Sequence, residues 1–367
     1  MSEPDEETAF ETLVDVLLER EASQSNDVAY TFCDYAPKVQ DANGGPREES
    51  TTYGELIRDA KAVAADLQAR GLSGHSVILL FTSGLDFLRA YLGCILAGAH
   101  ATPLRPPVTP GYMQQVAAIA HDAQTKAIMV SGALASRVRE ACARVPELGA
   151  IPVLTVEGRA RAATWQRPHV GAGDVALLQY TSGSTGLPKG VVVSHANLLH
   201  NEAVIRDAFG QDRSSVAVGW LPMFHDMGLI GNVLQPLFLG ARGIAFDPGA
   251  FVRRPVRWLQ LLTKYRATTS GGPNFGYELC IDRVSEEEKR GLDLSHWTLA
   301  FSGAEPVRMR TMRRFHQAFA DVGFRMEAFS PCYGLAESTL FVTGIEKRSP
   351  PSSMVLDAAA LAQHQVR

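Results

Sequence analysis

Short apolar runs alternate with segments of helical spacing along most of the chain. Residues 53–70 place apolar side chains three and four positions apart, on one face of a helix, and Gly71 follows as a helix stop. Residues 76–82 form a continuous apolar run of strand length, which is typical of a strand covered on both faces. Strands separated by helices need crossover connections, so this alternation predicts an α/β fold with mostly parallel sheets.

The same pattern predicts the other elements and the division of the chain. Helices are expected at residues 86–97 and 133–145, and strands at residues 126–130, 151–156, 175–180, 191–193, 216–221, 267–270 and 298–302. The polar stretch 158–173 has no clear period and separates two predicted α/β subdomains, residues 1–170 and 171–350. Residues 38–50 are predicted to be a loop. Residues 351–367 are expected to begin a linker or an insertion.

Composition and charge exclude several classes of protein. The 367 residues are 46% hydrophobic, which excludes a disordered chain, and the net charge of −4 provides no overall basic field for nucleic acid. The basic segment 308–314 is more simply a solvated helix face. Five cysteines without a CxxC pair argue against a disulfide framework or a zinc site. The acidic amino terminus and the interrupted apolar stretch 77–104 predict a cytoplasmic protein without a signal peptide or a membrane span.

The clearest chemical signal is the sequence TSGSTGLPKG at residues 181–190, directly after an apolar strand. Its glycines allow tight turns that bring backbone N–H groups close to an anion, and its hydroxyls and Lys189 add donors and a positive charge for phosphate oxygens. It is not the ordinary P-loop, which needs glycine before the lysine and a hydroxyl after it, because Pro188 and Gly190 stand there. The structural alternative is a flexible Ser/Gly turn.

Four further residues have chemistry of their own. Tyr333 offers an aromatic face for a purine, and Glu337 is an oxygen ligand suited to a magnesium ion that also touches phosphate. Their structural alternatives are a core aromatic and a residue favoured by the dipole in the first turn of a helix. His225 and Asp226 stand between apolar residues, where polar groups need partners. The alternative there is that Asp226 caps the following helix and His225 is structural.

Four segments, in this order, resemble the motifs of the adenylate-forming superfamily, which includes acyl-CoA synthetases, luciferases and fatty acyl-AMP ligases. They are residues 181–190, 219–229 (GWLPMFHDMGL), 302–306 (SGAEP) and 330–339 (SPCYGLAEST). The resemblance implies the large N-terminal domain of that superfamily, with mostly parallel sheets flanked by helices in a layered αβαβα arrangement. It also implies ATP as the nucleotide and Mg²⁺ as the metal.

The resemblance assigns roles to individual residues. Lys189, His225 and Glu337 would serve catalysis, and Glu337 and Thr185 would bind the metal. The acyl group would be bound by His225, Asp226, Met227, Gly272, Asn274 and Phe275. The nucleotide would be bound by Thr181, Ser182, Gly183, Ser184, Thr185, Gly186, Lys189, Ser302, Gly303, Ala304, Glu305, Pro306, Cys332, Tyr333, Gly334, Leu335, Ala336 and Ser338.

Within the superfamily, residues 221–240 and 251–280 resemble the fatty acyl-AMP ligases most, and Ala336 stands where many other relatives carry threonine. That branch implies a fatty acid substrate, release of pyrophosphate, and transfer of the acyl group to the phosphopantetheine arm of an acyl carrier protein in polyketide or lipopeptide synthesis. The alternatives are an acyl-CoA synthetase and, from another class, a non-catalytic module that binds nucleotide or acyl chain. Nothing after Thr339 resembles the ribose-binding acid or the small C-terminal domain with its mobile lysine, so this chain alone is expected to be nearly inactive.

Overall fold

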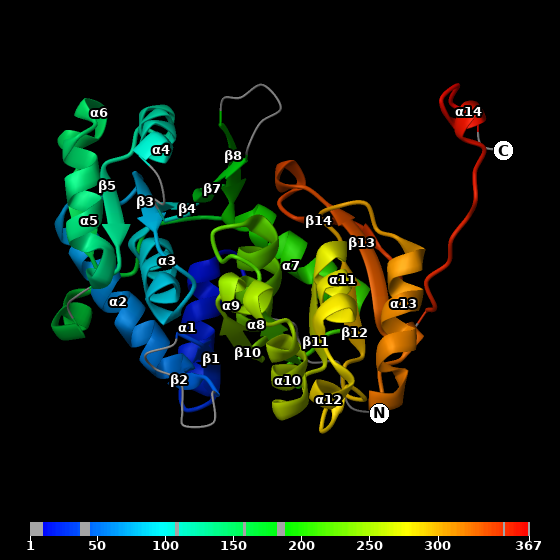
Figure 1. Ribbon diagram of the computed structural model, residues 1–367. Coiled ribbons are helices and arrows are strands. Elements are labelled where there is room, and N and C mark those ends of the chain that lie inside the picture. The colour runs from blue at the N-terminus through cyan, green and yellow to red at the C-terminus, as the bar shows by residue number, and fades with distance from the viewer. Residues whose placement is uncertain are drawn as a thin grey trace.

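The structure, a computed structural model, describes residues 10–36, 45–106, 110–156, 159–181, 188–347 and 349–365. Its strands form two sheets with helices on both sides, which confirms the predicted α/β fold (Figure 1). After the last strand the chain runs away from the sheets and carries one short helix, α14 (Ala358–Leu361). The described part of the chain contains no helix with the length and apolar character that a bilayer crossing requires.

The larger sheet has eight strands in the order β14-β13-β12-β11-β9-β10-β1-β2. Its inner pairings are parallel, whereas the edge strands β2 and β14 pair antiparallel with their neighbours. The strands are β1 Val28–Asp34, β2 Arg47–Thr52, β9 Val216–Gly219, β10 Arg242–Phe246, β11 Thr269–Gly272, β12 Leu299–Ser302, β13 Phe329–Gly334 and β14 Phe341–Gly344.

The smaller sheet has six strands in the order β6-β5-β3-β4-β7-β8, and only the β7–β8 pairing is antiparallel among its described residues. The strands are β3 Ser76–Leu80, β4 His100–Leu104, β5 Ala127–Val130, β6 Val153–Thr155, β7 Val175–Thr181 and β8 Lys189–Ser194. Both faces of this sheet are covered. Val77 and Leu79 of β3 belong to the core shared with the larger sheet, while Ile78 and Leu80 belong to a separate cluster on the opposite face.

The sheets divide the chain differently from the boundary predicted at residue 170. β1 and β2 precede that boundary but lie in the larger sheet, and β7 and β8 follow it but lie in the smaller one. The apolar pattern of a strand favours its burial and does not specify which strand it pairs with. The prediction of a loop at residues 38–50 is wrong for residues 47–50, which belong to β2. This edge strand is polar and mostly exposed, so it has no hydrophobic pattern that would indicate a strand.

The helices form three layers around the two sheets (Figure 1). The middle layer lies between the two sheets: α2 contacts β1 and β2 of the larger sheet, α3 contacts β3 and β4 of the smaller sheet, and α7 contacts one strand of each, β14 and β8. This layer is α1 Leu13–Gln24, α2 Tyr53–Ala69, α3 Leu85–Ala97, α7 His195–Phe209 and α8 Gln235–Leu239. The outer layers are α4 Pro110–Asp122, α5 Gly132–Ala143 and α6 Pro146–Gly149 on the smaller sheet, and α9 Pro248–Arg253, α10 Val256–Lys264, α11 Asn274–Arg283, α12 Glu286–Lys289 and α13 Met309–Phe319 on the larger.

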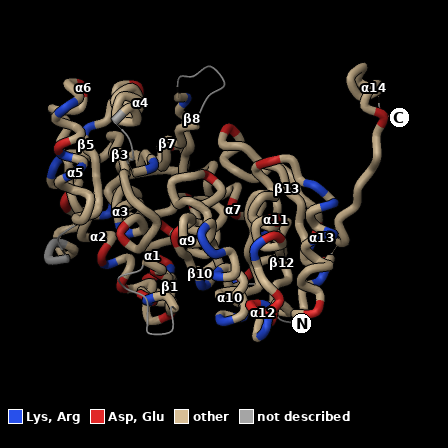
Figure 2. Tube along the Cα trace, viewed as in Figure 1, with Lys and Arg blue, Asp and Glu red and all other residues tan. Residues whose placement is uncertain are grey.

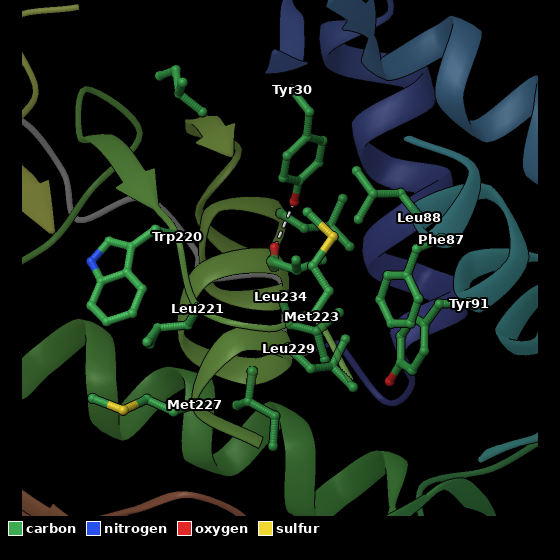
Figure 3. Packing of buried hydrophobic residues seen from close by; sticks show 14 of the residues in the cluster. Tyr30, Phe87, Leu88, Tyr91, Trp220, Leu221, Met223, Met227, Leu229 and Leu234 are labelled. Carbon is green, nitrogen blue, oxygen red and sulfur yellow. Dashed lines mark hydrogen bonds between the residues drawn. The ribbon is translucent and has the colours of Figure 1, made fainter. Parts of the chain in front are cut away.

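The middle layer also contains a π-helix, Met227–Leu234, which leads directly into α8. Figure 3 shows its buried Leu229 and Leu234 facing Phe87 and Tyr91 of α3. Tyr30 of β1 donates a hydrogen bond of 2.5 Å to the backbone carbonyl of Val233 in the same helix. The π-helix is therefore fixed by both packing and hydrogen bonding. π-bulges are rare and frequently occur at functional sites.

Acidic and basic residues are both distributed over many elements of the fold (Figure 2). The basic segment 308–314 lies on and just before α13, as one face of a helix. Its Arg314 pairs with two carboxylates of the neighbouring helix α11, Glu278 and, at 3.0 Å, Asp282. The segment is thus partly neutralised within the fold.

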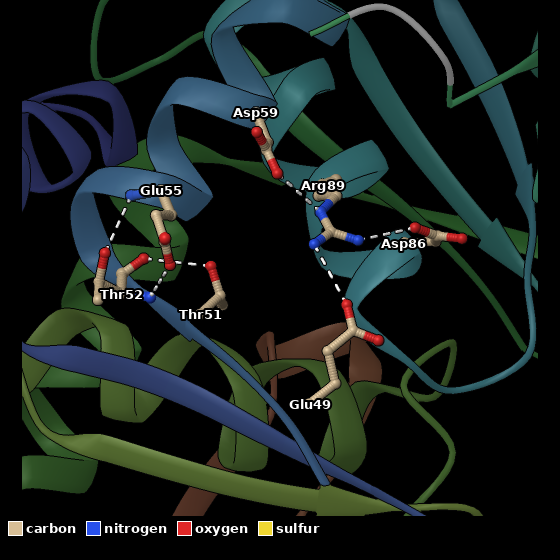
Figure 4. Close-up of polar contacts among 7 residues, drawn as sticks. All are labelled: Glu49, Thr51, Thr52, Glu55, Asp59, Asp86 and Arg89. Carbon is tan, nitrogen blue, oxygen red and sulfur yellow. Dashed lines mark hydrogen bonds and ion pairs between the residues drawn. The ribbon is translucent and has the colours of Figure 1, made fainter. Parts of the chain in front are cut away.

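Arg89 of α3 joins three segments of the fold (Figure 4). Its guanidinium lies 3.1 Å from Asp59 of α2, 2.9 Å from Asp86 and 3.5 Å from Glu49 of the edge strand β2. The Arg89 side chain is only 13% exposed and that of Asp59 only 6% exposed. A charge pair at this depth is costly to separate, because either partner alone would be left charged in a poorly solvated position.

We expect Arg89→Met to lower the free energy of unfolding by roughly 2–4 kcal/mol, since it removes the Arg89 guanidinium from beside the buried Asp59 carboxylate. Urea denaturation of the purified protein measures this change. Arg70→Met is the matched control, because Arg70 pairs with Asp66 at an exposed i,i+4 position that is worth about 0–1 kcal/mol. Equal destabilisation by the two substitutions would show that Arg89 acts only as a surface charge.

Candidate active site

Two of the sequence motifs meet at the carboxyl ends of neighbouring strands in the larger sheet. β12 ends at Ser302, and Ser302 pairs in parallel register with Pro331 of β13. Gly303 therefore lies beside Cys332, and a Cβ added to Gly303 would stand 3.0 Å from both the carbonyl oxygen and the Sγ of Cys332. The two segments touch backbone against backbone. In α/β folds, ligands bind in the crevice outside the carboxyl ends of the strands.

A cavity of about 170 Å³ opens at this edge of the sheet. It brings the histidine motif, the residues after β12 and those on β13 to one place, although they lie up to about a hundred positions apart in the chain. Its walls are mainly apolar. The lining residues that the sequence predicted to be functional are His225, Asp226, Met227, Gly303, Ala304, Cys332, Tyr333 and Gly334.

The histidine motif stands where the π-helix begins. Asp226 caps this helix, because its Oδ1 accepts a hydrogen bond of 2.7 Å from the backbone N–H of Met227. The same oxygen lies 2.6 Å from Nδ1 of His225, whose side chain is 64% exposed. The capping alternative for Asp226 is therefore confirmed, and the same carboxylate also orients His225 at the rim of the cavity.

The hydrogen bond that Nδ1 of His225 donates to the Asp226 carboxylate raises the pKa of His225 above its usual value of 6.5. We expect Asp226→Asn, which retains a helix-capping side chain, to return this pKa toward the usual value. The raised pKa means that the folded protein stabilises protonated His225. The contribution of this interaction to the stability of the protein is therefore present at acid pH and is lost as the pH rises through the raised pKa. NMR titration of the His225 ring measures the shift. An unchanged pKa in the variant would contradict the role given to Asp226.

Tyr333 and Glu337 lie around the hairpin of β13 and β14. Tyr333 is 59% exposed and borders the cavity, so it is not a core aromatic. Glu337 is exposed in a short 3₁₀ turn, Ala336–Ser338, in which Ala336 is buried and Ser338 exposed. Asn201 of α7 holds this region in place through two hydrogen bonds to the backbone of Phe341. The side-chain N–H of Asn201 donates to the Phe341 carbonyl at 2.9 Å, and its side-chain oxygen accepts from the Phe341 N–H at 3.0 Å.

The hairpin of β7 and β8 holds the ends of the predicted phosphate loop. Thr181 ends β7 and stands opposite Lys189, the exposed first residue of β8. Ser182, Gly183, Ser184, Thr185 and Gly186 lie outside the described residues. Figure 1 shows this hairpin and that of β13 and β14 at the same end of the molecule.

The remaining nucleotide-motif residues lie around the end of β12. Ser302 is buried, while Ala304, Glu305 and Pro306 are exposed. Ala304 has φ +66°, a left-handed conformation that costs energy for a residue other than glycine. Strain of this kind clusters at ligand-binding segments. Leu335 follows Gly334 on the way to the 3₁₀ turn and is half-buried.

Three residues predicted to bind the acyl group lie away from the cavity. Successive side chains of a strand point to opposite faces, so Gly272 faces the other side of β11 from Thr269, which lines the cavity. A Cβ on Gly272 would stand 2.6 Å from the Trp220 ring, which occupies that side. Asn274 is buried. Its side-chain N–H donates a hydrogen bond of 3.1 Å to the hydroxyl of Thr311, and its Oδ1 accepts one of 3.2 Å from the backbone N–H of Arg308.

Phe275, the third of these residues, is 42% exposed at the start of α11 and packs its ring 5.7 Å from that of Trp220. Its backbone N–H donates a hydrogen bond of 2.6 Å to the carboxylate of Glu305, which thereby caps the first turn of α11. The rest of the cavity wall comes from residues that the sequence motifs did not include. They are Ile205, Phe209, Gln211, Gly231, Thr269, Phe301, Leu340 and Phe341.

The AMP-binding enzyme family matches the chain over residues 18–358, a range that contains every motif described above. The chain belongs to this family. It is 38% identical over 372 residues to the medium-chain-fatty-acid–[acyl-carrier-protein] ligase JamA of Moorena producens, covering 100% of this chain and 61% of JamA. It is 34% identical over 361 residues to the long-chain-fatty-acid–AMP ligase FadD26 of Mycobacterium tuberculosis, covering 96% of this chain and 60% of FadD26.

Among solved structures, the chain resembles the fatty acyl-adenylate ligase from L. pneumophila, crystallised in complex with acyl adenylate and pyrophosphate. The TM-score is 0.85 and the identity 42%, over 93% of this chain and 58% of that one. The fold is therefore that of the large N-terminal domain of adenylate-forming enzymes. The chain spans about 60% of the length of these members of the AMP-binding family.

The residues present fit the nucleotide and metal that an AMP-binding enzyme implies. The described part of the chain has no group of three or more His, Cys, Asp and Glu residues that could enclose a metal ion. Mg²⁺ does not need one, because it is usually held by one or two carboxylates together with substrate phosphates. The exposed carboxylate of Glu337 suits such a site, and the exposed ring of Tyr333 suits a purine.

Proposed function

We propose that the protein containing this chain activates a fatty acid as an acyl-adenylate and passes the acyl group to the phosphopantetheine thiol of an acyl carrier protein. The observation that carries this proposal is the cavity, which joins an apolar chamber to His225 and to the residues of the adenine motifs. An acyl chain needs an apolar chamber, and its carboxylate must reach the nucleotide. Relatives named as acyl-carrier-protein ligases and acyl-AMP ligases support the same substrate and acceptor.

The first step forms a bond between a carboxylate oxygen and the α-phosphorus of ATP and breaks the bond to the β-phosphate, so that pyrophosphate leaves. Tyr333 would stack on the adenine, and Glu305 and Gly303 would border its edge. His225, oriented by Asp226, would hold the carboxylate end of the acyl chain. Lys189 would place a positive charge against the phosphates. Mg²⁺, when held by Glu337, would supply further charge neutralisation there.

In the second step the carrier thiol attacks the acyl carbonyl and AMP leaves. Coenzyme A has the same pantetheine arm, so the choice of acceptor depends on what lies beyond that arm. We place the discrimination in an unfavourable contact with the nucleotide end of coenzyme A, because rejection of the wrong partner is a common source of specificity. The five free cysteines favour a reducing compartment, so we place the reaction in the cytoplasm.

Radiolabelled fatty acid, ATP and Mg²⁺ given to the full-length protein test this proposal. We expect acyl-AMP that persists when coenzyme A is added, and transfer of the label to a phosphopantetheinylated carrier protein. Efficient formation of acyl-CoA would instead identify an acyl-CoA synthetase. Absence of ATP–pyrophosphate exchange with every fatty acid would identify a non-catalytic binding module.

A further inference from the structure

The acyl cavity and a second hollow lie on different sides of helix α7. Ile205 and Phe209, four positions apart on this helix, line the cavity of about 170 Å³. Ala196, Leu199 and Ala203 line the second hollow, a surface groove of about 1120 Å³ that also borders α1 and α8. Residues three or four positions apart share one face of a helix, so each space lies against its own face of α7 and the helix separates the two.

Beyond the last turn of α7, the side chain of Gln211 separates the cavity from the groove. The helix ends at Gly210, which has φ +52°, and the backbone N–H of Gln211 donates a hydrogen bond of 3.0 Å to the carbonyl of Arg206. This turn places Gln211 between the two spaces, and among the described residues it alone lines both of them. Gln211 is 8% exposed, so it is held within the protein rather than in solvent.

Buried hydrogen bonds hold Gln211 in this position. One of 3.2 Å joins its amide to the hydroxyl of Thr269, and one of 2.9 Å joins it to the amide of Gln235. Gln235 accepts from Gln211 and donates in turn to the carboxyl of Glu202 on α7. Glu202 is 0%, Gln235 1% and Thr269 6% exposed. A side chain that is tied on both sides into a buried polar network is not free to swing aside, so Gln211 is a fixed wall.

We propose that the Gln211 side chain is the end wall of the acyl cavity and sets the longest acyl chain that the protein accepts, because it closes the passage into the groove. This inference rests on the function proposed above and adds a limit on the substrate. A cavity of about 150 Å³ holds benzene, so one of about 170 Å³ accommodates roughly six to eight carbon atoms. A longer chain meets the wall, and shortening the Gln211 side chain lets it continue into the groove.

Calorimetric binding of non-hydrolysable acyl-sulfamoyl-adenosine analogues to the full-length protein tests the proposal. We expect the hexadecanoyl analogue to bind at least about 10-fold more weakly than the octanoyl analogue, the scale of one methylene group that a pocket cannot accept. In Gln211→Ala the hexadecanoyl analogue should regain at least about this factor of 10. Binding of the octanoyl analogue should change little, because water from the groove can replace the lost hydrogen bonds. Gln211→Ser, which also shortens the side chain but keeps a hydroxyl for the network, should behave as Gln211→Ala does.

Gln211→Met is the matched control, because it keeps the length of the side chain and removes its hydrogen bonds. It should retain the preference for the octanoyl analogue. Equal binding of the two analogues by the unmodified protein, a preference that survives both shortening substitutions, or a preference that Gln211→Met abolishes would overturn the end-wall proposal while leaving the proposed function intact. Failure of every acyl analogue to bind would instead overturn the proposed function.

Discussion

Replacing Lys189 with alanine in the full-length protein is expected to slow acyl-adenylate formation about 10²–10³-fold, the scale of one lost charge-stabilising group. The side chain is exposed at the first position of β8, opposite Thr181, so its removal takes away charge beside the predicted phosphate loop and no core packing. Thermal stability should therefore change little. ATP–pyrophosphate exchange measures the rate, and a thermal melt measures the stability.

Lys126→Ala is the control for this prediction, because Lys126 is also an exposed lysine and lies directly before a strand of the same sheet. Its substitution should leave both exchange and melting temperature unchanged. An exchange rate for Lys189→Ala within about twofold of the unmodified protein, or a variant that fails to fold, would show that Lys189 does not stabilise charge in the reaction.

Glu337→Gln is expected to reduce adenylation to a similar degree and to raise the Mg²⁺ concentration needed for half-maximal rate. The substitution keeps the size of the side chain and removes the negative charge, which is what a hard cation binds. Because Glu337 is exposed in its 3₁₀ turn, the free energy of unfolding should stay within about 0.5 kcal/mol. The dependence of exchange on Mg²⁺ concentration separates loss of metal binding from loss of fold.

Glu327→Gln provides a matched comparison, because Glu327 is also the exposed middle residue of a three-residue 3₁₀ turn, Met326–Ala328, just before β13. It should leave the Mg²⁺ dependence unchanged. A Glu337→Gln variant with an unaltered Mg²⁺ dependence would assign this carboxylate to a role other than metal binding.

Several features of the fold and the site could be predicted without the structure. The apolar run that became β3 is buried on both faces, as its lack of alternation indicated. The two readings of Asp226, as cap or as part of the site, were both available from the sequence, and the structure shows that one carboxylate does both. For Tyr333 the sequence left the core alternative open, and only its exposure in the folded chain removed it.

Other features had no local signal. β2 is a polar edge strand, and its pairing with β1 rests on backbone hydrogen bonds rather than on a hydrophobic face. Ile205 and Phe209 stand four residues apart on α7, a spacing that indicates a buried face but not a cavity beside it. Glu202 lies on the same helix among apolar neighbours, and its connection to Gln235 joins residues more than thirty positions apart.

The sequence by itself determined the α/β alternation and the motif residues, because periodic burial and the chemistry of loops are local properties of the chain. Only the tertiary structure decided which residues surround the cavity. Thr269 and Gly272 lie three positions apart on β11, so they face opposite layers: Thr269 meets the cavity beside α7, and Gly272 meets Trp220. Which face of a strand meets which layer depends on how the crossover helices pack, and no short-range pattern encodes that choice.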